Sequence, residues 1–127
     1  MDLDNYFGIH AKALHVREQR ADQLAINLSN VDTPNYKAKD IDFKTALRQA
    51  LSPTEQMVTD APNHINAQAD FSTQIKYRHP SHEAMDGNTV DKEIETAEFA
   101  HNALSYQASL SFLNSKIRTM MTALRGE

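Results

Sequence analysis

The sequence predicts a mainly α-helical protein in which two long helices, one at each end of the chain, pack as an antiparallel coiled coil. Three observations favour this fold class. A heptad pattern runs unbroken near the C-terminus, a weaker seven-residue repeat lies near the N-terminus, and only three glycines occur in 127 residues. We expect one domain, residues 1–127, in which a turn motif, a short helix and an irregular or short-β middle segment join the two helices.

The N-terminal helix is expected over residues 5–31. Asp2 or Asp4 can cap its start. Apolar residues face one side at seven-residue spacing, and a companion leucine joins them in the second half of the helix. The residues of this predicted assembly surface are Phe7, Leu14, Ala21, Leu24 and Leu28.

A turn and a short helix are expected over residues 32–51. Pro34 disfavours helical geometry at Thr33 and so ends the first helix. Asn35 is a residue type that tolerates a left-handed backbone. After an extended strip at 37–43, helical spacing returns and ends before Pro53. The residues with this spacing are Phe43, Ala46, Leu47, Ala50 and Leu51.

Residues 52–88 show no helical period and contain three prolines. Apolar and polar residues alternate between Ile65 and Tyr77, which is typical of one or two short strands. The other interpretation is a flexible connection, and we expect a partly ordered loop.

The C-terminal helix, residues 89–125, organises the rest of the chain. Its apolar residues recur at gaps of four and three without a break, over a length of about 50 Å. Thr89 or Asp91 can cap its start, and Gly126 follows as a stop. This first apolar stripe consists of Phe99, Ala103, Tyr106, Leu110, Leu113, Ile117, Met120 and Leu124.

A second apolar stripe lies on another face of the same helix. A pair of helices needs one apolar face each, so this additional face is available to neighbouring subunits. It consists of Val90, Ile94, Ala97, Leu104, Ala108 and Phe112.

Composition excludes several classes of function. The net charge is −4 and no basic patch interleaved with aromatic residues occurs, so we expect no nucleic-acid partner. The sequence contains no run of 18 apolar residues, so we expect no direct membrane insertion. The N-terminal residues lack the pattern of a cleavable signal peptide, which taken alone favours the cytosol. The chain has no cysteine, so neither a disulfide nor a catalytic thiol is expected.

Candidate chemical sites are weak. His79, His82 and Glu83 have a spacing that could surround a metal ion, but Pro80 and the polar context favour a solvated loop. The acidic residues 91–95 suit the start of a helix better than a catalytic carboxylate pair. No phosphate-binding loop or nucleophile motif is present. We therefore predict no catalytic, cofactor-binding or metal-binding residues, no cofactor and no enzymatic activity.

Residues 24–37 carry a recognisable motif. They read L-A-I-N-L-S-N-V-D-T-P-N-Y-K and resemble the N-terminal signature of the bacterial flagellar axial proteins (rod, hook and hook-associated), approximately L-A-N-N-I-A-N-x-x-T-P-G-Y. Ile26 replaces an Asn and Asn35 a Gly, and Asn keeps the ability to take positive φ. The matching residues are Ala25, Asn27, Asn30, Thr33, Pro34 and Tyr36.

Further stretches resemble the proximal rod proteins within that family. They are residues 37–43, 87–93 and 106–117, so the resemblance covers about 5–50 and 85–127. Relatives often carry two more residues near 87–93. A sister proximal rod protein of similar size is the nearest alternative.

The resemblance implies a structural subunit of the proximal rod of the flagellar basal body, which transmits torque and supports motility. Such subunits assemble helically with copies of themselves and with other rod subunits, and contact the MS ring and an adaptor protein at the base of the rod. They reach the periplasm unfolded, through the flagellar type III export apparatus and without a cleavable signal peptide. Phe43 and Leu47 resemble the element which that apparatus reads, although one face of a short helix explains them equally well.

Two other functions remain open from the residues alone. A cytosolic helical coiled-coil adaptor should form a stable, cooperatively melting monomer. A small hydrolase or metal protein would use residues 79–83. For a rod subunit, we expect the dilute monomer to be partly helical, because its apolar stripes lack their partners.

Overall fold

The computed structural model describes residues 3–51, 75–82 and 84–126, and for residues 3–7 and Ala50 it describes the backbone alone. The chain is mainly helical, as predicted. The helices are α1 (Leu3–Ser29), α2 (Phe43–Leu51) and α3 (Lys92–Arg125), and the strands are β1 (Lys39–Ile41) and β2 (Ile75–Tyr77).

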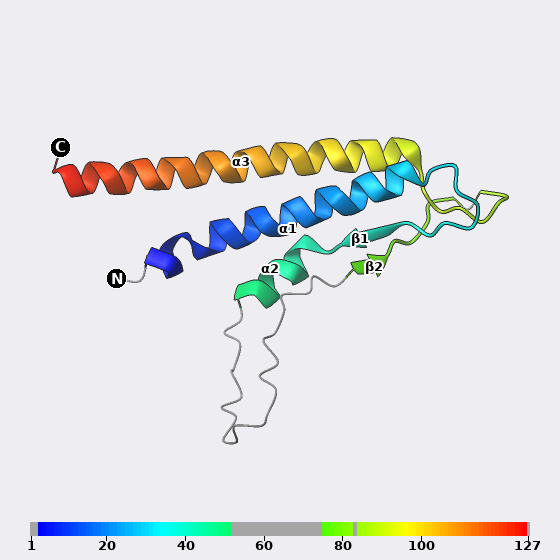
Figure 1. Cartoon of the computed structure of the whole chain (residues 1–127), viewed down its shortest axis with the longest axis horizontal. Helices are drawn as coiled ribbons and strands as arrows, with labels where there is room; N and C mark the ends of the chain where they lie inside the picture. The colour runs from blue at the N-terminus through cyan, green and yellow to red at the C-terminus, as the bar shows by residue number, and fades with distance from the viewer. Residues whose placement is uncertain (1–2, 52–74, 83, 127) are drawn as a thin grey trace, which may run out of the picture.

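Helix α1 is the central element (Figure 1). It lies alongside α3, which runs in the opposite direction, and its other side carries β1 and α2. Both termini therefore lie at the same end of the molecule, and α3 extends past the start of α1. The regular apolar seam of a coiled coil between these two helices remains a prediction.

The apolar core is small and lies where α1, β1 and α2 meet. Val16, Ile41 and Ala46 are buried there, and Phe43 packs against them. The guanidinium of Arg17 stacks over the Phe43 ring at 4.1 Å from its centroid, which covers the edge of this core with a cation–π contact. Further buried apolar residues are Ala13, Leu24 and Ala38.

Three local predictions are confirmed. The Asp91 carboxylate caps α3 by accepting from the backbone N–H groups of Glu93 and Ile94. Gly126 ends the helix in a left-handed conformation (φ 74°), and its N–H donates to the Thr122 carbonyl. Asn35 also takes positive φ, at 60°. Helix α1 ends at Ser29, two residues before the predicted bound.

The two strands form a small antiparallel sheet. Lys39 pairs with Tyr77 and Ile41 with Ile75. Residues 39–41 of the predicted strip 37–43 and the last three residues of the predicted alternation therefore form strands, while Phe43 already belongs to α2. Residues 52–74, where the rest of that alternation falls, lie outside the described part of the chain.

Candidate assembly interface

The face of α3 that packs against α1 is centred on polar residues. Glu95 and Asn102, seven positions apart, are the buried residues of α3 in its described part, each 1% exposed. The first apolar stripe lies beside this polar line and is about half open: Phe99 is 40% exposed, and Tyr106 and Leu110 are 38% exposed. Helix α3 thus buries two polar side chains in its contact with α1, and apolar side chains of the first stripe flank them.

Asn27 lies at the centre of the polar contacts and is 0% exposed. Its Nδ2 donates to the Lys39 carbonyl (2.7 Å) and to Glu95 Oε2 (3.1 Å). Its Oδ1 accepts from the Lys39 N–H, the Tyr36 hydroxyl and Gln23 Nε2 at 3.2–3.3 Å. One motif asparagine therefore ties α1 to the turn, to β1 and to α3.

Ion pairs extend this arrangement. Arg20 donates to both carboxylate oxygens of Asp40 (2.9 Å each) and to Glu98 Oε2 (2.8 Å). Arg78, which follows β2, donates to Asp40 Oδ2 and to Glu95 Oε1, both at 2.6 Å. We call Arg20, Asn27, Asp40, Arg78, Glu95 and Glu98 the polar cluster. It joins α1, the sheet and α3.

The polar cluster shifts the pKa values of Asp40, Glu95 and Arg20. Burial alone would raise the pKa of Asp40, but hydrogen bonds from Arg20 and Arg78 hold it below its ordinary value. Burial raises the pKa of Glu95, against the opposite pull of Asn27 and Arg78. The hydrogen bond to Asp40 is the main reason why the pKa of Arg20 is raised. Asp40 is thus the carboxylate that the arginines hold in its charged form.

A second contact closes the turn after α1. Asn88 is 3% exposed, and its Nδ2 lies 2.8–3.0 Å from the carbonyl oxygens of Asn30, Val31 and Thr33. Its Oδ1 accepts from the Val90 N–H at 2.8 Å. The segment that precedes α3 therefore holds the turn that follows α1 by its backbone carbonyls.

The signature turn is held from the same segment. The Asn35 N–H donates to the Asp86 carbonyl, and the Thr89 N–H donates to the Tyr36 carbonyl, both at 3.0 Å. Asn27 is the buried residue of the motif, and Asn30 and Tyr36 are half-buried. Ala25, Thr33 and Pro34 are exposed.

Sequence reasoning missed several of these roles. Glu95 lies among the acidic residues that indicate a helix start, and no sequence pattern points to the contacts of Asp40, Arg78 and Asn88. One signal for a polar contact is present in the sequence. Glu95 and Asn102 lie seven residues apart, so they share one face of the helix beside the apolar heptad pattern.

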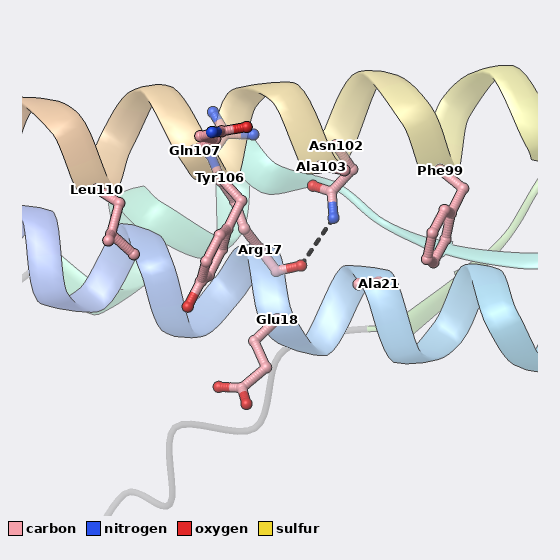
Figure 2. A pocket seen from close by; sticks show the side chains of 9 residues that line it. All are labelled: Arg17, Glu18, Ala21, Phe99, Asn102, Ala103, Tyr106, Gln107 and Leu110. Carbon is pink, nitrogen blue, oxygen red and sulfur yellow. Dashed lines mark hydrogen bonds between the residues drawn. The ribbon is translucent and has the colours of Figure 1, made fainter.

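An apolar groove lies between α1 and α3 (Figure 2). It encloses about 480 Å³, and Phe99, Tyr106 and Leu110 are directed from α3 toward α1. Asn102 Nδ2 donates to the Arg17 carbonyl across it at 2.8 Å, while Asn102 Oδ1 and Arg17 Nε have no partner within the described residues. We call this pocket the α1–α3 groove. The residues that line it are Arg17, Glu18, Ala21, Phe99, Asn102, Ala103, Tyr106, Gln107 and Leu110.

The other predicted assembly residues differ in burial. Leu24 is fully buried, whereas Ile117 is 41% and Leu124 81% exposed. The side chain of Phe7 lies outside the description. In the second apolar stripe, Leu104 and Phe112 are 69% and 64% exposed. The half-buried residues are Leu14, Ala21, Leu28, Leu113 and Met120, and Ala103 is exposed.

The remaining candidate residues form no chemical site. Phe43 and Leu47 are half-buried on α2. Within residues 3–51, 75–82 and 84–126, no three metal-binding side chains come together, and Glu83 lies outside these ranges. None of the helices in this described part combines the length and the apolar character needed to cross a membrane.

Comparison with known proteins identifies the family. No family model matches the chain. It is 43% identical to the flagellar basal body rod protein FlgB of Aeromonas hydrophila over 129 residues, which covers 100% of this chain and 98% of that protein. The FlgB protein of Escherichia coli K12 is 38% identical over 131 residues, covering 97% and 95%. These relatives define the class of protein, a structural subunit of the flagellar rod. The chain belongs to the family of flagellar basal body rod protein FlgB.

Family membership decides between the functions left open by the residues. The FlgB proteins of Cereibacter sphaeroides match as well, with 42% identity over 120 residues and 94% of each chain covered. The prediction of a structural protein rather than an enzyme is confirmed. The alternatives, an adaptor or a sister rod protein, are not favoured by these relatives.

Proposed function

We propose that this chain is a structural subunit of the proximal rod of the flagellar basal body, where it assembles helically with copies of itself and with other rod subunits and transmits torque. The observation that carries the proposal is the half-open first apolar stripe of α3. Its line of large side chains continues along the helix while α1 covers only part of it.

Burial energetics favour association of this stripe. Fully burying a Leu, Ile or Phe side chain is worth about 1.5–3 kcal/mol relative to leaving it exposed. Phe99, Leu110 and Ile117 each keep about 40% of their surface open. Packing against neighbouring helices would capture the rest, and a regular coiled-coil seam would then form between subunits as well as within one.

The finer features of this proposal follow from the family resemblance. The chain forms one rod-type domain, contacts the MS ring and the adaptor protein at the rod base, and lies in the periplasm after export through the flagellar type III apparatus. Phe43 and Leu47 are the candidate element for that apparatus. Both are half-buried in α2, so the element would be readable in an unfolded chain.

A charge placed in the stripe tests the assembly role. Leu113→Asp puts a carboxylate on the half-buried face of α3, where a neighbouring helix would have to desolvate it. We expect loss of swimming and of rod assembly, while the variant is still secreted. Ser111→Asp adds the same charge at an exposed position of α3 and should leave swimming intact.

Motility assays, together with immunoblots of isolated basal bodies and of culture medium, separate the steps. Normal swimming of the Leu113→Asp strain would contradict the proposed packing. In circular dichroism, the dilute chain should show incomplete helicity that rises on association. A dilute chain whose helicity is already complete and does not change on association would contradict this expectation.

A further inference from the structure

The end of α3 has the pattern of a helix that docks into a groove. Ile117, Met121 and Leu124 follow i, i+4, i+7 spacing and are 41%, 46% and 81% exposed. This spacing places three anchors on one face of a helix. We call residues 117–125 the α3 tail. It lies at the end of α3 that extends past α1, so its last turns have less cover than the rest of the helix (Figure 1).

The α1–α3 groove has the complementary shape and chemistry. Phe99 and Tyr106 form one apolar wall and Ala21 belongs to the other, so large side chains face a small one (Figure 2). A volume of about 480 Å³ leaves room between them for apolar side chains. Asn102, which lines the groove, keeps a buried Oδ1 for which no donor lies within the described residues.

Charge complements the apolar match. The exposed side chain of Glu18 lies at the edge of the groove, and the exposed Asp22 follows one turn later on α1. The α3 tail carries the opposite charge, because Arg118 and Arg125 are exposed and share one flank of the helix, seven residues apart. Opposite charges beside an apolar contact fix its orientation and disfavour other partners.

The tail and the groove of one molecule cannot meet each other. Ala103 in the groove and Met121 in the tail lie 18 residues apart on the same continuous helix, which corresponds to about 27 Å. An occupant with the chemistry of the tail therefore has to come from another molecule.

We propose that the α3 tail of one copy of this chain docks into the α1–α3 groove of the next copy, with Arg118 and Arg125 on the side of Glu18 and Asp22. The proposal rests on the proposed function and specifies which surfaces meet when copies assemble. Each copy offers one groove and one tail, so the contact is head-to-tail and generates an open series of subunits.

Disulfide trapping in assembled basal bodies tests the contact. The chain has no cysteine, so it adds no background thiols. A chain with Ala103→Cys and Met121→Cys should form a ladder of dimers, trimers and larger species under mild oxidation, because a disulfide requires Cα atoms within about 7 Å. Each single variant should give no specific cross-link, because its thiol lies beside an unaltered side chain of the neighbouring copy and the chain has no other cysteine. The matched control, Ala100→Cys with Met121→Cys, places the first thiol on an exposed residue outside the groove and should give no ladder.

The outcomes separate this inference from the function on which it rests. Basal bodies that contain the A103C/M121C chain but yield no ladder would overturn the docking and leave the rod function intact. A disulfide-linked product with a different rod subunit that carries an added thiol at its own tail, in place of the ladder, would reassign the occupant and overturn a second copy. Absence of the unaltered chain from isolated basal bodies would instead remove the proposed function.

A charge exchange provides the second measurement and needs no cysteine. The R118E/R125E chain should lose swimming, because its tail would meet Glu18 and Asp22 with like charge. Adding Glu18→Lys and Asp22→Lys to that chain should restore swimming. If the four-residue variant swims no better than R118E/R125E while the E18K/D22K chain also swims normally, the assigned orientation is wrong.

Discussion

Asn27 of α1 and Glu95 of α3 are joined by a hydrogen bond of 3.1 Å between two side chains that solvent barely reaches. The bond spans 68 positions of sequence. It places a motif residue of the N-terminal helix against the start of the C-terminal one, so the two ends of the chain are held together by polar contacts in addition to apolar packing.

Removing the Asn27 side chain should be costly. Asn27→Ala leaves the Lys39 backbone groups and Glu95 without their partner in a buried setting, which should lower the free energy of unfolding by about 2–4 kcal/mol. Asn114→Ala makes the same substitution at an exposed site of α3 and should change it by less than about 0.5 kcal/mol. Urea unfolding followed by circular dichroism gives both values, and similar losses in the two variants would refute the role of Asn27.

Acid should weaken the fold through Asp40. Its pKa is lowered in the folded state, so its charged form contributes stability above the ordinary carboxyl value of 3.8, and this contribution is lost as the pH falls through the lower folded pKa. Asp40→Asn should therefore be less stable at pH 7, by about 1–3 kcal/mol because two arginines lose a partner. Below pH 4, the difference from the unaltered chain should shrink.

The measurement for Asp40 is the urea midpoint between pH 7 and pH 3. Asp32→Asn, an exposed position in the turn, is the control for the loss of one negative charge. A constant difference between Asp40→Asn and the unaltered chain over this range would contradict the assignment.

Substitution of two glycines by alanine should change the stability of the fold in opposite directions. Gly87 has φ +78°, and an added Cβ would lie 2.5 Å from Asn35 Oδ1, so Gly87→Ala should destabilise by about 1–3 kcal/mol. Gly8 lies within α1, with no atom within 4 Å of an added Cβ. Gly8→Ala should therefore stabilise by about 0.5–1 kcal/mol. Thermal melts of both variants decide, and a shift of the same sign in each would show that backbone conformation is not the cause.

The contribution of Asn88 to stability should depend on the N–H donors of its side-chain amide. Asn88→Asp keeps the shape of the side chain but points a carboxylate at the carbonyls of Asn30, Val31 and Thr33. We expect a loss of about 2–4 kcal/mol at pH 7, because acceptors then face acceptors in a buried place. Hydrogen exchange should quicken at the end of α1. Asn114→Asp, on the exposed side of α3, should leave that exchange unchanged.

Local rules were sufficient for the types of the helices and for several local features at their ends. The Asp91 cap, the Gly126 stop and the positive φ of Asn35 depend on a few neighbouring residues, and each was predicted from its own stretch of sequence. The two long helices were predicted because apolar spacing and terminal charges agree over many turns.

Such local rules could not predict which side chains of α3 lie at the centre of its contact with α1. Heptad spacing identifies the apolar side of a helix, but here Glu95 and Asn102 take the centre of the contact with α1, and the apolar stripe borders it. That choice follows from pairing with Asn27, Arg78 and the Arg17 carbonyl, which are distant in sequence. The location of Arg78 beside Asp40 likewise depends on the register of β1 and β2.

The contact between Arg20 and Glu98 joins residues separated by 78 positions. A polypeptide that arrives N-terminus first brings α1 to its destination long before the residues that neutralise Arg20 on the α3 side. Until about four fifths of the chain has arrived, its N-terminal helix faces water with part of its ion-pairing unmet. In a chain delivered N-terminus first, Arg20 would therefore gain its contact with Glu98 only after α3 arrives, and folding would be completed by the last helix.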